Sequence, residues 1–133
     1  MKYLLDTNII SNLVIEPQGR AAQKLEAVGE GNVFTSVIAH AELMFGVRKR
    51  GSSELARKVG NVVYRLYVDP FAPPADSHYA EIRLELERRG EIIGPNDLLI
   101  AAHALAVDAT LVTDNVKEFS RVPGLRVENW LRA

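Results

Sequence analysis

The chain has 133 residues, 47% of them hydrophobic and 25% charged, and a formal net charge of −1, which is typical of one globular domain spanning residues 1–133. No apolar run approaches the roughly 20 residues that a membrane-spanning helix needs, and Asp6 breaks the apolar start too early for a signal peptide. The absence of cysteine excludes disulfides and thiolate metal sites. We therefore expect a soluble protein of the cytoplasm.

Segments with the pattern of strands and helices alternate along the chain. Short apolar runs predict strands at residues 2–5, 32–35, 66–68, 109–112 and 125–127. Apolar residues at helical spacing predict helices at residues 8–14, 17–28, 36–50, 52–65, 76–89 and 98–107, and a short helical turn at Phe119. Pro17 suits the first turn of the second helix, and Ser36 or Thr35 suits the cap of the third. This alternation predicts an α/β fold, a parallel sheet with helices on both faces.

Acidic residues follow the predicted strands. Asp6 comes directly after the first strand, Glu42 lies in the helix after the second, Asp97 lies in the first turn of the apolar helix, and Asp114 follows the fourth strand. Because ligands of such sheets bind beyond the carboxyl ends of the strands, these acids are expected to converge. Converging carboxylates repel one another unless a cation lies between them, and Mg²⁺ or Mn²⁺ prefers oxygen ligands. For Asp6 the alternative role is that of a helix cap.

Glu42 lies in the middle of its predicted helix, where a glutamate is usually exposed. Its neighbours three and four residues away, which share its helix face, are apolar or small: Ile38, Ala39, Phe45 and Gly46. We therefore expect Glu42 to face the interior or a crevice, with Ala39 and Gly46 leaving room for a substrate backbone to approach.

The three histidines do not share a helix face with these acids. His40 is two residues from Glu42, His103 is six residues from Asp97, and His78 has no acid at ligand spacing. We therefore expect neither a zinc site nor histidine catalysis, and the histidines are interpreted as structural or exposed.

Basic residues concentrate between positions 47 and 65, where six of them accompany a single acid, Glu54. The six are Arg48, Lys49, Arg50, Arg57, Lys58 and Arg65. Such a block either binds phosphates or forms a solvated helix face.

Four ordered motifs, taken together, resemble those of PIN-domain ribonucleases. They are Leu5-Asp6-Thr7-Asn8, the segment from Thr35 to Leu43, the segment from Pro95 to Ala104, and the segment from Leu111 to Phe119. The resemblance covers essentially the whole chain. Within this family, the chain is similar to the VapC toxins of toxin–antitoxin pairs. The resemblance implies a Mg²⁺- or Mn²⁺-dependent endoribonuclease, a homodimer and a VapB-like antitoxin as inhibitor. By motif, Asp6, Glu42 and Asp97 take the metal-binding positions.

The fourth metal-binding position of the family is occupied here by Asn115, where an acid is common. Asp114 beside it or Glu118 one turn later can supply the acid, or Asn115 itself can bind through its carbonyl. A further alternative is that only one metal ion binds tightly in the free enzyme. Thr7 and Thr113 are expected to orient the acids by hydrogen bonds, or else to be ordinary turn hydroxyls.

These residues predict a metal-dependent hydrolysis of RNA phosphodiester bonds. Arg48, Lys49 and Arg50 are expected to bind the RNA backbone that flanks the cleaved bond. By resemblance the substrate is a structured RNA loop, such as the anticodon loop of a tRNA. One alternative is a PIN nuclease of RNA processing outside a toxin–antitoxin pair. A second is an aspartate-based phosphatase or phospho-receiver, which also places an acid after its first strand, and a third is a module that only binds a partner.

Overall fold

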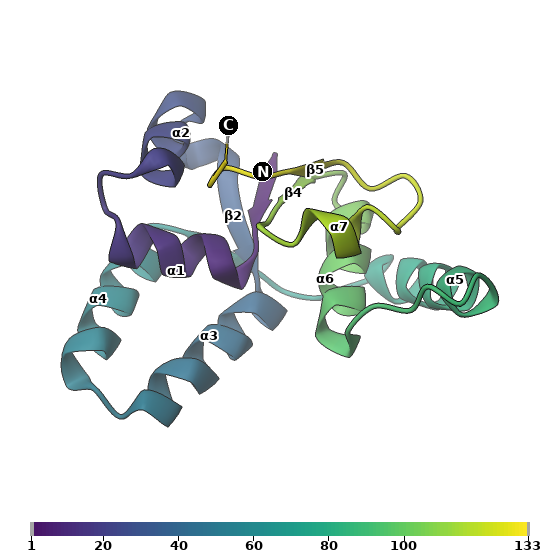
Figure 1. Ribbon diagram of the computed structural model, residues 1–133, viewed down its shortest axis with the longest axis horizontal. Coiled ribbons are helices and arrows are strands. Elements are labelled where there is room, and N and C mark those ends of the chain that lie inside the picture. The colour runs from purple at the N-terminus through teal and green to yellow at the C-terminus, as the bar shows by residue number, and fades with distance from the viewer. Residues whose placement is uncertain (1, 133) are drawn as a thin grey trace.

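Five short parallel strands form the centre of the computed structural model, which describes residues 2–132 (Figure 1). The strands are β1 (Tyr3–Leu5), β2 (Val33–Ser36), β3 (Tyr67–Asp69), β4 (Thr110–Val112) and β5 (Val127–Glu128). The helices are α1 (Thr7–Ile15), α2 (Arg20–Val28), α3 (Val37–Arg50), α4 (Ser53–Tyr64), α5 (Ala75–Arg88), α6 (Pro95–Ala106) and α7 (Val116–Phe119), with a single 3₁₀ turn, η1, at Glu30–Asn32. Among residues 2–132, no helix is both long and apolar enough to cross a membrane.

The strand order is β3-β2-β1-β4-β5, so the chain adds strands first on one side of β1 and then on the other. Leu5 at the end of β1 pairs with Thr35 of β2 and Val112 of β4. The order therefore reverses between β1 and β4. In parallel sheets of this kind the crevice at such a reversal, beyond the carboxyl ends of the strands, is where ligands bind.

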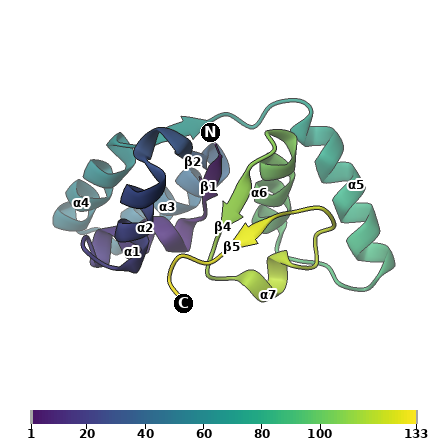
Figure 2. The same cartoon turned by 90° about the horizontal axis from the view of Figure 1, so that it is seen from above.

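The two faces of the sheet are buried by different helices because successive strand residues point to opposite sides. Leu4 belongs to the apolar cluster that includes α5 and α6, whereas Leu5 belongs to the cluster that includes α1 and α2. Figures 1 and 2 show α1, α2 and α4 on one side of the strands and α5 and α6 on the other. The predicted three-layer α/β/α fold is confirmed.

The apolar helix α6 is buried on most sides, as predicted, with Leu98 and every residue from Ile100 to Ala104 in the interior. Ser36 caps α3 and Ser52 caps α4, each accepting a hydrogen bond from a backbone amide of the first turn. The strand boundaries differ from the prediction by one or two residues, which is the usual uncertainty of an element's end.

One local prediction was wrong. Pro17 does not lie in the first turn of α2, which begins at Arg20 after Gly19, so Pro17 belongs to the turn that precedes it. Phe45 does not face the interior: its side chain is 67% exposed, and the buried residues of α3 are Ala39 and Leu43. The second half of α3 projects beyond the sheet in Figure 1, and there it faces α4 across a shallow groove.

Candidate active site

Asp6 lies directly after β1, at the reversal of the strand order, and only 4% of its surface is exposed. Its Oδ1 accepts a hydrogen bond from the Thr7 amide at 2.8 Å and thereby caps α1, while its Oδ2 accepts one from the Thr113 hydroxyl at 2.8 Å. The two roles expected for Asp6, helix cap and site residue, are therefore compatible. Burial raises the pKa of Asp6, hydrogen bonds from Thr113 and Thr7 oppose that effect, and the charge of Glu42 adds to it.

Glu42 reaches the same region from α3. Its Oε1 accepts a hydrogen bond from the Thr7 hydroxyl at 2.9 Å, and its Oε2 accepts one from the Asn96 side chain at 3.2 Å. Glu42 is half-buried. Glu42 thus points towards Thr7 and Asn96, whereas Phe45, three residues later, is exposed.

Asp97 and Glu118 form a close acid pair. Asp97 lies in the first turn of α6, and Glu118 of α7 hydrogen-bonds to it. Burial raises the pKa of Asp97 to about 8, and the hydrogen bond and charge of Glu118 and the charges of Asp6 and Glu42 act in the same direction. Burial also disfavours the charged Glu118, but hydrogen bonds from Asp97, Gly94 and Asn115 outweigh it and lower the pKa of Glu118. The two pKa shifts are opposite in direction, as expected for two acids that lie close together.

Gly94 lies against this acid pair. Its backbone amide donates to Glu118 Oε1 at 2.9 Å. A Cβ at this position would lie 3.2 Å from Asp97 Oδ2, so a larger residue would require the Asp97 carboxyl to shift by a few tenths of an ångström. The distance to Glu118 Oε1, 3.6 Å, is an ordinary van der Waals contact.

Asp114 is not brought into contact with the other acids. Its Oδ1 accepts hydrogen bonds from Asn129 at 3.0 Å and from Arg132 at 3.1 Å, and these two partners lower the pKa of Asp114. Asn115 instead turns towards the acid pair and donates from Nδ2 to Glu118 Oε2 at 2.7 Å. Among the three residues considered for the fourth position, Glu118 is the acid that lies beside Asp97.

Two asparagines of the site were not singled out from the sequence. Asn96 holds Glu42, and Asn8 donates to Asp6 Oδ2 at 3.4 Å while its Oδ1 accepts from the Asp114 amide at 3.0 Å. The spacing rule for helix faces does not apply to Asn8, because Asp6 precedes the helix. The signal that could have found both is their position inside the motifs that carry Asp6 and Asp97.

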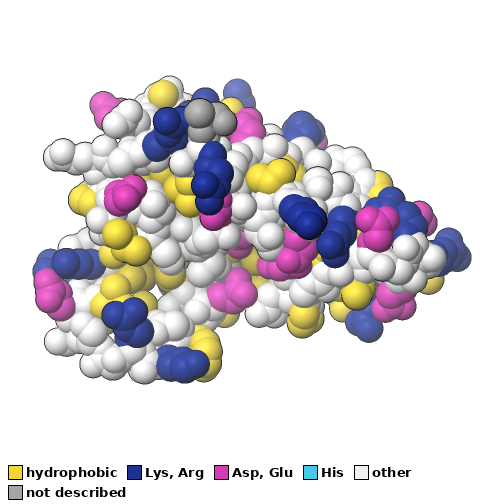
Figure 3. Space-filling model, in the orientation of Figure 1, with side chains coloured by type: hydrophobic (Ala, Val, Ile, Leu, Met, Phe, Trp, Pro, Cys, Tyr) yellow, Lys and Arg dark blue, Asp and Glu magenta, His cyan; other side chains and the backbone are white. Residues whose placement is uncertain are grey.

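None of the four acids Asp6, Glu42, Asp97 and Glu118 forms a salt bridge with a Lys, Arg or His side chain within residues 2–132. Figure 3 shows acidic side chains in the middle of this face, between α3 and α7. Neutral donors orient Asp6, Glu42 and Glu118, and Asp97 lies against Glu118. The four carboxylates make an all-oxygen set of the kind that Mg²⁺ or Mn²⁺ prefers. In the described part of the chain no three such side chains stand close enough to enclose an ion as they are, so sharing one requires side-chain rotation.

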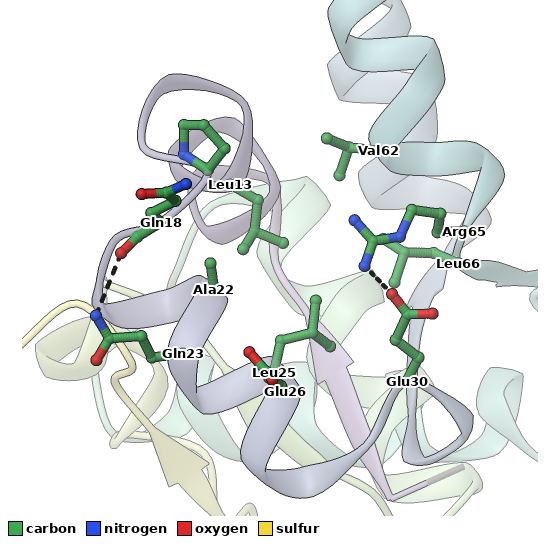
Figure 4. A pocket seen from close by; sticks show the side chains of 11 residues that line it. Leu13, Gln18, Ala22, Gln23, Leu25, Glu26, Glu30, Val62, Arg65 and Leu66 are labelled. Carbon is green, nitrogen blue, oxygen red and sulfur yellow. Dashed lines mark hydrogen bonds and ion pairs between the residues drawn. The ribbon is translucent and has the colours of Figure 1, made fainter.

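A cavity of about 630 Å³ is separate from these acids (Figure 4). It lies between α1, α2 and α4, with Leu13, Ala22, Leu25 and Val62 on its walls and the Glu30–Arg65 ion pair at its edge. Its lining is mixed and carries no cluster of acids, so it offers no chemistry comparable to that of the acidic site.

The basic residues lie at the far end of α3. Arg48, Lys49 and Arg50 are exposed in its last turn, and none of them forms a salt bridge within residues 2–132. The Lys49 ammonium lies 5.9 Å from the centre of the exposed Phe45 ring. Lys58 and Arg65, by contrast, pair with Glu54 and Glu30.

Comparisons with known proteins agree with this site. The PIN domain family matches residues 3–125. Ribonuclease VapC2 of Rickettsia felis is 43% identical over 132 residues, which cover 98% of each chain, and the tRNA(fMet)-specific endonuclease VapC of Shigella flexneri is 34% identical over 131 residues, again 98% of each.

A solved structure supports the same assignment. In the crystal structure of VapBC2 from Rickettsia felis bound to a DNA fragment from their promoter, one chain matches with a TM-score of 0.89 and 41% identity, covering 98% of this chain and 99% of that one. The phospho-receiver alternative finds no support in these relatives, which are named ribonucleases and endonucleases. The chain belongs to the PIN-domain family and, within it, to the VapC ribonucleases, which are hydrolytic endoribonucleases.

Proposed function

We propose that this ribonuclease is a divalent-metal-dependent toxin that cuts a structured RNA, and that Asp6, Glu42, Asp97 and Glu118 hold the ion. The observation that carries the proposal is the gathering of four carboxylates without a salt-bridged cation at the reversal of the strand order. A bound Mg²⁺ or Mn²⁺ would supply an activated water and neutralise charge that develops on the phosphate oxygens.

The remaining residues of the site act on these acids. Thr113 and Thr7 orient Asp6 and Glu42, Asn96 holds the second oxygen of Glu42, and Asn115 with Gly94 holds Glu118. Such partners fix the direction of a ligand's lone pairs and limit the rotations open to it. Asp114 serves a different purpose in this proposal, because its contacts with Asn129 and Arg132 tie the C-terminal segment to the end of β4.

The RNA backbone is proposed to cross from the acids to the far end of α3. Arg48, Lys49 and Arg50 carry positive charge that no acid of the described chain neutralises by a salt bridge, so they are available to phosphates. Binding of this kind weakens as salt rises, because counterions are released from the nucleic acid. The relative from Shigella flexneri, named for its action on tRNA(fMet), supports a tRNA as substrate, and we place the cut in the anticodon loop, where bases are unstacked.

Two protein partners belong to the proposal. The Rickettsia felis relative was solved as a VapBC complex, which supports a VapB-like antitoxin as the inhibitor of this chain. The second partner is another copy of this chain, which gives a homodimer. The exposed apolar side chains Val37, Met44 and Phe45 along α3 support it, because a second copy would cover them.

Expression of the wild type and Asp6→Ala in growing cells tests the function. We expect growth arrest and new RNA 5′ ends in one tRNA species for the wild type, and neither for Asp6→Ala, because the variant loses one buried carboxylate of the site. Asp76→Ala, an exposed acid on α5, is the matched control and should remain toxic. Equal toxicity and identical RNA ends for a folded Asp6→Ala protein would contradict a metal nuclease.

The same cells separate a toxin from an RNA-processing enzyme. A toxin should be encoded next to a small open reading frame for a DNA-binding antitoxin, and co-expression of that frame should restore growth and remove the new RNA ends. If cleavage persists with every neighbouring small frame co-expressed, the processing alternative is favoured.

The fourth position is tested by comparing Glu118→Gln with Asp114→Asn. Glu118 lies against Asp97 and Gly94, so its neutral variant should raise the Mn²⁺ concentration for half-maximal cleavage by about tenfold or more. Asp114 faces Arg132 and Asn129 instead, so Asp114→Asn should change that concentration less than about threefold, the range of a surface substitution. Cleavage assays at increasing Mn²⁺ concentration measure this value for both variants. A larger effect of Asp114→Asn than of Glu118→Gln would assign the fourth position to Asp114.

A further inference from the structure

Three polar side chains form a buried chain of hydrogen bonds away from the acidic site. His103 Nδ1 lies 2.8 Å from Ser36 Oγ, and His103 Nε2 lies 2.7 Å from Asp69 Oδ2. Ser36 is fully buried, His103 is 1% exposed and Asp69 is 9% exposed. The His103 ring also lies against the rings of Phe34 and Phe71.

The order Ser-His-Asp is that of a nucleophilic triad, but this one has no access to a substrate. Ser36 Oγ already accepts the Ile38 amide as the cap of α3. With Asp69 ionised, Nε2 of His103 carries the proton that it donates, and the Ser36 hydroxyl can donate to Nδ1. All the polar groups are therefore satisfied within the protein, which is the pattern of a structural network.

The network joins three elements at one place. Ser36 ends β2 and caps α3, His103 lies in α6, and Asp69 ends β3. Glu42 follows Ser36 by six residues along α3, and Asp97 precedes His103 by six residues along α6. At about 1.5 Å per residue, each acid lies about 9 Å along its helix from the network.

The acids of these two helices lie close together, because Glu42 of α3 accepts a hydrogen bond from Asn96, the residue next to Asp97 in α6. Two carboxylates that must share one ion repel each other until the ion is bound. Repulsion at one end of two packed helices tends to change their separation unless they are tied elsewhere. Apolar contacts such as Ala39 and Ala102 in the shared core allow sliding, whereas a hydrogen bond has a preferred direction and length.

We propose that Ser36, His103 and Asp69 are positioning residues that hold α3 and α6 in the relative arrangement in which Glu42 and Asp97 share a divalent ion. The inference rests on the proposed function, since it concerns the geometry of that same site. None of the three residues touches the ion or the RNA, and each acts through the helix or strand end that carries it.

The test compares variants that break the network with variants that only weaken the fold. His103→Leu and Asp69→Ala remove the hydrogen bonds, Asp69→Asn keeps an acceptor oxygen for Nε2, and Ile100→Ala opens a cavity at a fully buried position of the same helix. Calorimetric titration of the metal-free proteins with Mn²⁺ measures ion affinity, and thermal melting measures stability.

We expect His103→Leu and Asp69→Ala to bind Mn²⁺ about tenfold more weakly than the wild type, and Asp69→Asn to bind within about twofold of it. Ile100→Ala should melt at a lower temperature and keep its Mn²⁺ affinity. The KM for RNA should not change in any variant at saturating Mn²⁺, because the proposed RNA contacts lie at the far end of α3.

The inference is overturned if Asp69→Ala binds Mn²⁺ like the wild type, or if Ile100→Ala weakens binding as much as Asp69→Ala does. If His103→Leu fails to fold, the comparison of Asp69→Ala with Asp69→Asn decides the question. A wild-type protein that binds no Mn²⁺ would instead overturn the proposed function, so the two failures are distinguishable.

Discussion

Replacement of Asp97 by Asn is expected to lower the rate of RNA cleavage by about 10³-fold, the scale seen when one charge-stabilising group is removed from an active site. The same change should make the metal-free protein more stable above pH 8. The reason is that Asn resembles the protonated Asp97: it has the same shape, and its amide can donate to Glu118 as the carboxyl proton does. The variant thus keeps the hydrogen bond and loses the repulsion from Asp6, Glu42 and Glu118.

Single-turnover cleavage assays and melting curves in a chelator measure the two effects of Asp97→Asn. The stability difference from the wild type should vanish near pH 5, where Asp97 is protonated in the folded protein. Asp76→Asn, an exposed acid of α5, serves as the matched control and should change neither quantity. Wild-type activity in the variant, or a lower melting temperature at pH 9, would contradict the role assigned to Asp97.

The stability of the metal-free wild type should fall as the pH rises from 5 to 8. In the folded protein the pKa of Asp97 is raised to about 8, whereas an unfolded Asp titrates near 3.9, so between these values only the folded state keeps the proton. Stability falls with pH wherever the folded state binds more protons. Asp6, whose pKa is raised as well, contributes in the same direction. The lowered pKa of Glu118 acts in the opposite sense and only in acid.

Because Asp97 is half-buried, solvent screens part of this effect, and we expect a loss of about 3 °C in melting temperature per pH unit. Saturating Mn²⁺ should reverse the trend, since the ion binds the deprotonated acids. At a concentration 100 times the dissociation constant, ligand binding stabilises a protein by about 2.7 kcal/mol, or roughly 10 °C for a domain of this size. Melting scans from pH 5 to 9, in chelator or in Mn²⁺ at matched ionic strength, measure both trends. A melting temperature that rises with pH in chelator would be the contrary result.

The fold was predictable because its signals are local. Short apolar strands of two to four residues alternate with helices that carry one apolar face, and this alternation specifies a parallel sheet between two helical layers. Asp6 at the end of β1 and Asp97 at the start of α6 were predictable for the same reason, since a strand or helix end places its neighbours at the edge of the sheet.

The outcome at Phe45 shows where local signals stop. Its spacing from Glu42 put it on the same helix face, but a face becomes interior only where another layer covers it. In α3 only Ala39 and Leu43, both in its first half, are buried. The second half faces α4 across a groove and ends in the exposed basic turn.

The fourth position depended on contacts between distant parts of the chain. Asp114, Asn115 and Glu118 are close in sequence and chemically similar, so the sequence alone left three residues open. Asp114 accepts hydrogen bonds from Asn129 and Arg132, fifteen and eighteen residues later, and therefore points away from the other acids. Glu118 accepts one from the amide of Gly94, 24 residues earlier, and therefore lies beside Asp97. The hydrogen bond between His103 and Ser36 joins residues 67 positions apart, so the local sequence pattern could not predict it.

By itself, the sequence determined the three-layer fold, the family resemblance and the edge of the sheet at which the acids meet, because these follow from apolar periodicity and from residues next to strand ends. Only the tertiary structure decided which acid stands beside Asp97 and which histidine ties α3 to α6. Both depend on the directions of side chains that hydrogen bonds between distant segments select.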